Sequence, residues 1–195
     1  MEYLIRKVQD GDETNLSYIQ TESWKAAFKN ILSEEILRKS TDITRATAMY
    51  KHLLDENIGN GYILEVDGKP HCIAWWDRAR DKDMTDYAEL ICIHSLQDKW
   101  RKGYGTKMMN KVLKDIKAAG YSKVMLWVFT ENNRARRFYE ANDDGGMVNG
   151  TAKKLIKEVK INIIVRSFLD FKSLTALTNI NSNIAIILPV YILNH

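Results

Sequence analysis

The stretch AELICIHSLQDKWRKGYGTKMMNKVLKDIKAAGYSKVMLWVF, residues Ala88 to Phe129, decides the fold. An apolar run is followed by a basic turn with two glycines, then by a periodic segment and a second apolar run. The periodic segment places apolar residues on one face and lysines on the other, which predicts an amphipathic helix that ends at Gly120. The flanking runs, 89–94 and 124–129, predict parallel strands joined by a right-handed crossover.

The turn before this helix contains Arg101, Lys102, Gly103, Tyr104 and Gly105. A helix N-terminus presents backbone N–H groups and a partial positive charge, which favour a phosphate. Glycine lets the backbone approach a ligand closely, and the two basic residues attract an anion. The turn therefore predicts a phosphate-bearing ligand, although a tight turn with solvated basic residues has the same pattern. Neither the P-loop nor the dinucleotide fingerprint fits its glycine spacing.

The remaining pattern predicts an α/β (α+β) fold. Two β-rich runs flank Asp67 and Gly68 and indicate a hairpin over 61–76. A strand over 3–8 and a helix opening near Asp12 precede it, followed by a second helical stretch over 33–57. With the strands and the short helix expected after residue 129, the order predicts a central mixed, partly antiparallel sheet.

Composition excludes several classes of protein. The 195 residues fit one domain, and the net charge of +4 is too small to favour nucleic acid. Both cysteines lie in apolar runs, and no secretory signal is visible, so we expect a cytoplasmic protein. The apolar run Ile184–Leu193 is too short to span a membrane, so no membrane partner is expected. We expect a domain over 1–165 and an atypical, apolar, largely uncharged extension over 166–195, which is compatible with a homodimer.

Three motifs resemble the GNAT superfamily of acetyl-CoA-dependent N-acetyltransferases. The turn Trp100–Gly105 resembles the family motif Q/R-x-x-G-x-G/A, with Trp100 departing from its first position. VFTENNRARRFYE resembles the later N-x-x-A-x-x-(L/F)-Y-E helix, and SWKAAFKNILSEEIL resembles an acceptor-side helix. The resemblance covers roughly 1–141 and fails at 142–146, where NDDGG replaces the usual G-F.

The resemblance implies a central mixed sheet of about six to seven strands flanked by about four helices, with parallel strands 4 and 5 splayed apart. It also implies that acetyl-CoA is the co-substrate. Its diphosphate would lie on the backbone amides of the turn, and its pantetheine arm would pair with the strand that precedes the turn. The residues implied in these contacts are Ile93, His94, Ser95, Arg101, Lys102, Gly103, Tyr104, Gly105, Thr106 and Asn132.

The resemblance further implies direct attack of a neutral amine on the thioester. Tyr139 would donate a proton to the departing sulfur, since a free phenol has a pKa of about 10. Glu89, fourteen residues before Gly103, would be the general base, with solvent or His94 as alternatives. A packed aromatic residue or a satisfied core histidine would look the same in sequence. A covalent intermediate on Cys92 is not favoured, because no activating base is recognisable beside it.

The predicted function is acetyl transfer from acetyl-CoA to a primary amine of a small molecule or protein. The alternative is a non-catalytic acyl-CoA-binding sensor or interaction module. No metal cluster is recognisable in the sequence, and the arginines of the helix over 131–141 are better explained as an exposed face than as a nucleic-acid site. Aromatic residues could form the acceptor pocket or simply belong to the core: Trp24, Phe28 and Trp75.

Overall fold

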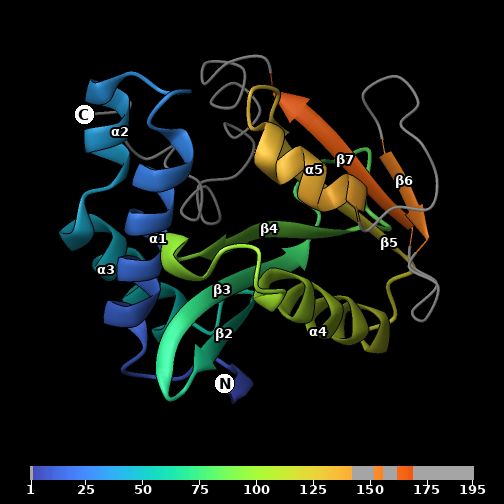
Figure 1. Ribbon diagram of the computed structural model, residues 1–195. Coiled ribbons are helices and arrows are strands. Elements are labelled where there is room, and N and C mark those ends of the chain that lie inside the picture. The colour runs from blue at the N-terminus through green and yellow to red at the C-terminus, as the bar shows by residue number, and fades with distance from the viewer. Residues whose placement is uncertain (1, 142–151, 156–161, 169–195) are drawn as a thin grey trace. The chain divides into compact units, whose positions relative to one another are not determined.

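The computed structural model describes residues 2–141, 152–155 and 162–168, drawn as coloured ribbons in Figure 1. Over these residues the chain has an α+β fold that combines a mixed β-sheet with five α-helices. The chain divides into two compact units. The first contains 2–75 and 92–112, and the second contains 76–91 and the described residues from 113 onward.

The sheet of the first unit begins with β1 (Tyr3–Lys7), which pairs antiparallel with β2 (Asn60–Val66). The strand order continues through β3 (Lys69–Arg78) to β4 (Ala88–Ser95). Asp67 and Gly68 join β2 to β3 with φ values of 50° and 72°. Two positive φ values in a two-residue loop match the twist of the flanking strands, so the predicted hairpin is confirmed.

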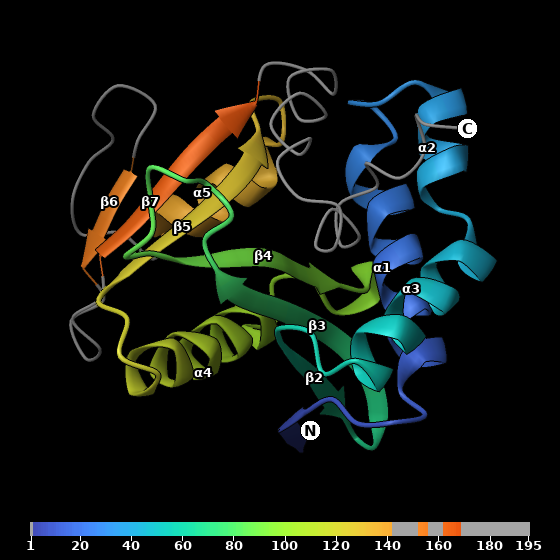
Figure 2. The ribbon, with the colours of Figure 1, turned by 180° about the vertical axis from the view of Figure 1, so that it is seen from behind.

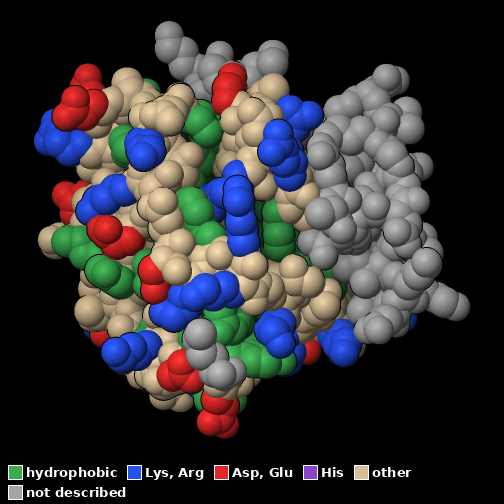
Figure 3. Space-filling model, in the orientation of Figure 1, with side chains coloured by type: hydrophobic (Ala, Val, Ile, Leu, Met, Phe, Trp, Pro, Cys, Tyr) green, Lys and Arg blue, Asp and Glu red, His purple; other side chains and the backbone are tan. Residues whose placement is uncertain are grey.

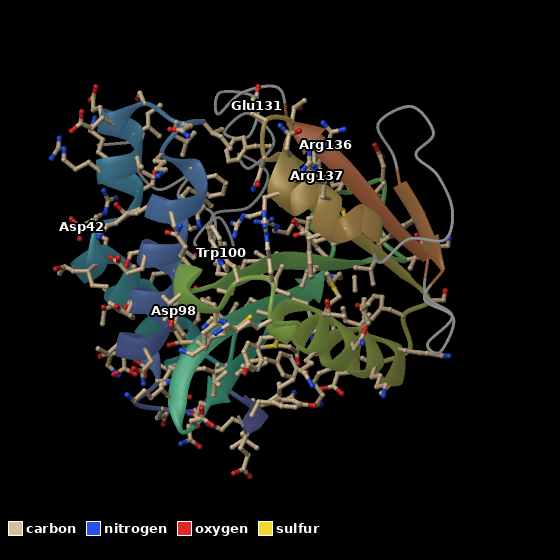
Figure 4. The ribbon with its side chains drawn as sticks, in the orientation of Figure 1. Asp42, Asp98, Trp100, Glu131, Arg136 and Arg137 are labelled. Carbon is tan, nitrogen blue, oxygen red and sulfur yellow. The ribbon has the colours of Figure 1, made fainter. Side chains whose placement is uncertain are left out.

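The helices of the first unit are α1 (Glu13–Phe28), α2 (Glu34–Ser40) and α3 (Ile43–Asp55). The expectation of a single helical stretch over 33–57, and of about four helices in all, is wrong. Asp42, labelled in Figure 4, leaves the helical conformation and accepts a hydrogen bond from the N–H of Arg45 at 3.0 Å. This side-chain cap starts a new helix. Both ribbon views show α1 and α3 side by side (Figures 1 and 2).

Trp75 anchors the core of the first unit. It is 2% exposed, its ring lies 5.8 Å from that of Tyr50, and its Nε1–H donates to the carbonyl of Ile58 at 3.2 Å. Gly61 lies directly against this ring: a Cβ added there would be 2.3 Å from Cζ3 of Trp75 and 2.6 Å from Cγ2 of Val8. The glycine is therefore required by close packing.

The helix α4 (Tyr104–Ala118) follows β4 after a short 3₁₀ turn, Gln97–Lys99. Its large apolar side chains are buried, while most of its lysines are exposed, as the periodic segment predicts. Gly120 has a φ of 95°, and the N–H of Tyr121 reaches back to the carbonyl of Ile116 at 3.2 Å. This left-handed cap confirms the predicted end of the helix.

In the second unit the strands are the end of β3 and the start of β4, then β5 (Lys123–Phe129), β7 (Asn162–Phe168) and β6 (Ala152–Leu155). β4 is parallel to β5, with Glu89 beside Met125, which confirms the predicted parallel pair. β7 is parallel to β5 and antiparallel to β6.

The helix α5 (Asn133–Ala141) lies along one face of β5 and β7 in both ribbon views (Figures 1 and 2). Of the expected extension over 166–195, the first three residues complete β7 and the rest lie outside the described residues. The segment 142–146 also lies outside them. None of the helices that the structure describes has the length and apolar character needed to cross a membrane.

Candidate functional site

The turn between β4 and α4 contains two residues with positive φ, Arg101 at 62° and Gly103 at 81°. A residue other than glycine is uncommon in this conformation. The indole of Trp100, labelled in Figure 4, donates from Nε1 to the carbonyl of Ser95 at 2.9 Å. The N–H of Trp100 donates in turn to the carbonyl of Gln97 at 3.2 Å. These bonds tie the turn to the end of β4 and define its path.

The opening of α4 presents backbone N–H groups beside two basic side chains. The N–H of Lys107 donates to the carbonyl of Gly103 at 3.1 Å, so the amides of Gly105 and Thr106 belong to the first turn, which the helix's own hydrogen bonds do not use. Arg101 and Lys102 are exposed immediately before it. Amides, helix dipole and basic side chains together make this an anion-binding arrangement.

His71 lies buried beneath this turn, on β3, with 1% of its surface exposed. Its ring is 5.4 Å from that of Tyr104, and its Nδ1 is 3.8 Å from Oδ1 of Asp98. Burial lowers the pKa of His71, Lys99 and Lys102 lower it further, and Asp98 opposes them. His71 is therefore a neutral packing residue at neutral pH, and it supports both the 3₁₀ turn and the first residue of α4.

The end of β4 is joined to α1 by aromatic residues. Trp24 donates from Nε1 to Nε2 of His94 at 3.3 Å, and its ring lies edge-on to Phe28 at 4.6 Å. Trp24 and Phe28 are both buried, whereas His94 is partly exposed. The structure thus brings two of the three predicted acceptor-pocket residues together with one of the predicted cofactor residues.

Of the other predicted residues in the first unit, two lie on the strand edge and one lies in the core. Ile93 and Ser95 flank His94 on β4 and are partly exposed, as a ligand-binding strand edge requires. Trp75, the third aromatic residue predicted for the acceptor pocket, fills the core against Tyr50 and Ile58, as described above.

In the second unit, Glu89 is paired with Arg80. Glu89 is 1% exposed. Its Oε2 accepts from the backbone N–H and the Nε–H of Arg80 at 3.2 and 2.9 Å, and its Oε1 accepts from Nη2. The carboxylate predicted to be the general base is therefore held by a guanidinium from the loop that joins β3 to β4.

Asn132 and Tyr139 lie at the two ends of α5, also in the second unit. The Oδ1 of Asn132 accepts from the N–H of Ala135 at 3.1 Å, and its carbonyl accepts from the N–H of Arg136 at 3.0 Å. Asn132 is thus the cap of α5. Tyr139 is partly exposed in the last turn. Figure 4 labels Glu131, Arg136 and Arg137 at the start and along this helix.

Both cysteines belong to the first unit and are buried. Burial raises the pKa of Cys92 to about 12 and also raises that of Cys72. Since the thiolate is the nucleophilic form, neither thiol is activated for a covalent intermediate. Within the described part of the chain, no group of three or more His, Cys, Asp or Glu side chains could hold a metal ion.

Three residues that the sequence did not predict contact predicted site residues or the turn: Arg80 in the second unit, and His71 and Asp98 in the first. Arg80 is one of two arginines in the charged loop over 77–86, and nothing in the sequence distinguishes it from Arg78. His71 and Asp98 meet only because β3 passes beneath the turn, where the N–H of Leu96 donates to the carbonyl of His71 at 3.0 Å. Basic and acidic side chains are interspersed on the face shown in Figure 3.

Comparison with known proteins gives one family and many solved structures. The sequence profile described as "Acetyltransferase (GNAT) family" matches residues 25–143. No curated protein matches the sequence. The PaiA N-acetyltransferase of Thermoplasma acidophilum, solved with coenzyme A, is similar at a TM-score of 0.62 and 20% identity, over 84% of this chain and 97% of that one.

Two further structures of similar fold are named for different acceptors. The ribosomal-protein-alanine N-acetyltransferase of Brucella melitensis biovar Abortus 2308 has a TM-score of 0.55 at 14% identity, over 76% of this chain and 94% of that one. The aminoglycoside N-acetyltransferase AAC(6')-Iy, in complex with CoA, has a TM-score of 0.56 at 14% identity, over 72% and 86%. At these identities the likeness concerns the fold.

Proposed function

Because the chain belongs to the acetyltransferase (GNAT) family, and is therefore an acyltransferase of the N-acetyltransferase type, we propose that it moves an acetyl group from acetyl-CoA to a primary amine. The acceptor is a small molecule or a protein, and the amine attacks the thioester directly in a ternary complex. Structures of similar fold are named for ribosomal-protein and aminoglycoside acceptors, which supports both classes as candidates. The observation that carries the proposal is the positive-φ turn of Arg101 and Gly103 at the opening of α4.

In this proposal the backbone amides of 101–106 bind the diphosphate of the coenzyme, and Arg101 and Lys102 add charge attraction. The partly exposed edge of Ile93, His94 and Ser95 pairs with the pantetheine arm. Because the Oδ1 of Asn132 already caps α5, its Nδ2 is the atom that donates to the same arm.

The chemistry needs one group that takes a proton and one that gives a proton. Glu89 takes a proton from the acceptor amine, and Tyr139 gives its phenolic proton to the departing thiolate. The tetrahedral intermediate collapses with cleavage of the C–S bond, so the N-acetylated acceptor and free coenzyme A leave. The buried thiols take no part, since burial keeps Cys92 protonated. Trp24 and Phe28 wall the acceptor side.

The test combines calorimetry with a thiol-release assay. We expect coenzyme A to bind the purified chain and acetyl-CoA to release thiol only when an amine is present, with mass spectrometry showing an acetylated product. Absence of coenzyme binding would refute the proposal. The panel should contain polyamines, aminoglycosides and peptides with free N-termini, which cover small and large acceptors.

One observation favours the alternative, a non-catalytic acyl-CoA sensor. The carboxylate of Glu89 is occupied by Arg80, as it would be in a protein that no longer needs a base. Coenzyme binding without transfer to any amine in the panel would support the sensor, whereas amine-dependent turnover would exclude it.

A further inference from the structure

The ion pair of Arg80 and Glu89 is unusual in its burial and its geometry. Glu89 is 1% exposed, and the side chain of Arg80 is 19% exposed. The guanidinium uses two of its N–H groups on the two oxygens of one carboxylate, in the fork arrangement that binds carboxylates most strongly. While this pair is intact, three donors of Arg80 occupy the two oxygens of the carboxylate.

The backbone and the side chain of Arg80 hold Glu89 separately. The N–H of Arg80 donates to Oε2, and the loop is closed just outside by a bond from the N–H of Ala79 to the carbonyl of Tyr87 at 2.9 Å. The main-chain contact and the loop closure involve backbone donors, so neither of them depends on the guanidinium.

We propose that the guanidinium of Arg80 occupies the position of the acceptor's ammonium group, and that the acceptor binds as a cation which exchanges with Arg80 on Glu89. This inference rests on the proposed function and names the class of acceptor. A buried carboxylate left without a cation is strongly destabilised, so a neutral acceptor cannot displace Arg80, whereas a protonated amine replaces one cation by another.

The surrounding charges agree with a cationic acceptor. In the loop over 77–86, four aspartates outnumber three basic residues, and one of the three is Arg80 itself. With Arg80 on Glu89 and Asp86 on Lys123, three aspartates and two basic residues of this segment remain, an excess of one negative charge. Such a surface raises the local concentration of cations and repels anions. An acceptor that carries carboxylates near its amine is therefore disfavoured.

The exchange also supplies the proton step. The bound ammonium passes one N–H proton to an oxygen of Glu89, which leaves a neutral amine and a neutral carboxylic acid. The amine lone pair then attacks the thioester carbonyl and the C–S bond breaks. The sulfur takes its proton from Tyr139, and the resulting phenolate takes the second N–H proton from the acylated nitrogen. Loss of the Glu89 proton to solvent and return of Arg80 restore the starting pair.

The decisive experiment is rescue of Arg80→Ala by free guanidinium. At non-denaturing, low-millimolar guanidinium chloride we expect a rise of a few degrees in the melting temperature of Arg80→Ala. Sodium chloride at the same concentration should not raise it, and neither salt should raise that of wild type. In the transfer assay, guanidinium should inhibit Arg80→Ala competitively with the amine, raising KM and leaving kcat unchanged. Arg78→Ala changes the exposed last residue of β3, two positions before Arg80; it is the matched control and should behave as wild type.

If Arg80→Ala does not fold, a second variant, Arg80→Lys, still tests the inference. Arg80→Lys retains a cation but loses the fork of two N–H donors. The lysine should compete less well than arginine with the acceptor for Glu89, so the KM of the amine should fall about threefold or more. An alcohol isosteric with the best amine should not inhibit either protein. The inference would be overturned if an alcohol bound as tightly as the amine, or if guanidinium changed neither the melting temperature nor the KM of Arg80→Ala. Amine-dependent turnover would still uphold the proposed function in either case. Absence of transfer to every amine would overturn both.

Discussion

The Nε1–H of Trp24 donates to Nε2 of His94 across 3.3 Å and so joins α1 to the end of β4 within the first unit. Because Nε2 accepts this bond, the proton of the neutral imidazole lies on Nδ1. The lone pair that His94 would need as a base at Nε2 is therefore already engaged. The contact favours a positioning role for His94 on the strand edge and leaves Glu89 as the proposed base.

Replacing Gly103 by valine should abolish coenzyme binding. Its φ of 81° suits glycine alone, and a β-branched residue there costs about 1–2 kcal/mol or forces the turn to change. An added Cβ meets nothing within 4 Å, so the protein should still fold. We expect at least a tenfold loss of affinity by calorimetry.

The control for this variant is Gly68→Val in the β2–β3 turn, where φ is 72° and the surrounding space is equally open. It should lose a similar amount of stability and bind coenzyme A as wild type does. Unchanged affinity in Gly103→Val would contradict the assignment of the turn.

Tyr139→Phe should lower kcat by roughly a hundredfold, the scale on which a positioned general acid acts. The affinity for coenzyme A should stay within about twofold, because the hydroxyl acts on the leaving sulfur. Stopped-flow thiol detection and calorimetry measure the two quantities. Tyr121→Phe, which removes a hydroxyl from the ring beside Trp76, should leave both unchanged. Equal kcat in Tyr139→Phe and wild type would remove the acid role.

Gly61→Ala should destabilise the fold by about 1–3 kcal/mol, as overpacking in a core does. The new methyl would overlap the ring of Trp75 and a methyl of Val8. Urea unfolding should show the loss as a lower midpoint with an unchanged slope. Adding Val8→Ala should recover part of the loss, because one of the two overlaps is removed. If the two changes are simply additive, the packing explanation fails.

His71 predicts a dependence of stability on pH. Burial lowers its pKa in the folded protein below the unfolded value of about 6.5. The folded state then binds fewer protons than the unfolded state, so this contribution to stability is present above pH 6.5 and is lost as the pH falls. Unfolding free energies measured from pH 7.5 to 5.5 should decrease by up to about 1.4 kcal/mol per pH unit from this group.

His71→Phe retains a ring against Tyr104 and cannot take a proton, so it should flatten the dependence on pH. His52→Gln, which changes an exposed histidine on α3, should leave it unchanged. An identical slope in His71→Phe and wild type would contradict the assignment.

Local signals explain what the sequence could predict. Asp67 and Gly68 encode a two-residue hairpin loop, and Gly120 encodes a helix end, because each needs a positive φ that few residues accept. The amphipathic period of α4 and the apolar runs of β4 and β5 define the parallel unit. The cap at Asp42 was also visible in the sequence, but the continuous helical periodicity on both sides of it concealed the break.

Contacts between distant segments explain what the sequence could not predict. The pairing of Glu89 with Arg80 rather than Arg78 depends on where the loop closes, between Ala79 and Tyr87. The position of His71 under the turn depends on the register of β3 against the segment after β4. The placement of Trp75 in the core, like that of Trp24 beside His94, also follows from packing, because a tryptophan at either position looks the same in the sequence.

Arg101 combines two opposing demands in one side chain. Glycine at this position would relax the left-handed backbone but would remove a cation from the mouth of the helix. An arginine there lowers the thermal stability of the fold through its left-handed backbone, but it places a positive charge that attracts an anion to the N-terminus of α4. A thermostabilised form of this protein, selected only for survival at high temperature, would therefore tend to lose this arginine and with it part of the proposed attraction for the diphosphate of coenzyme A.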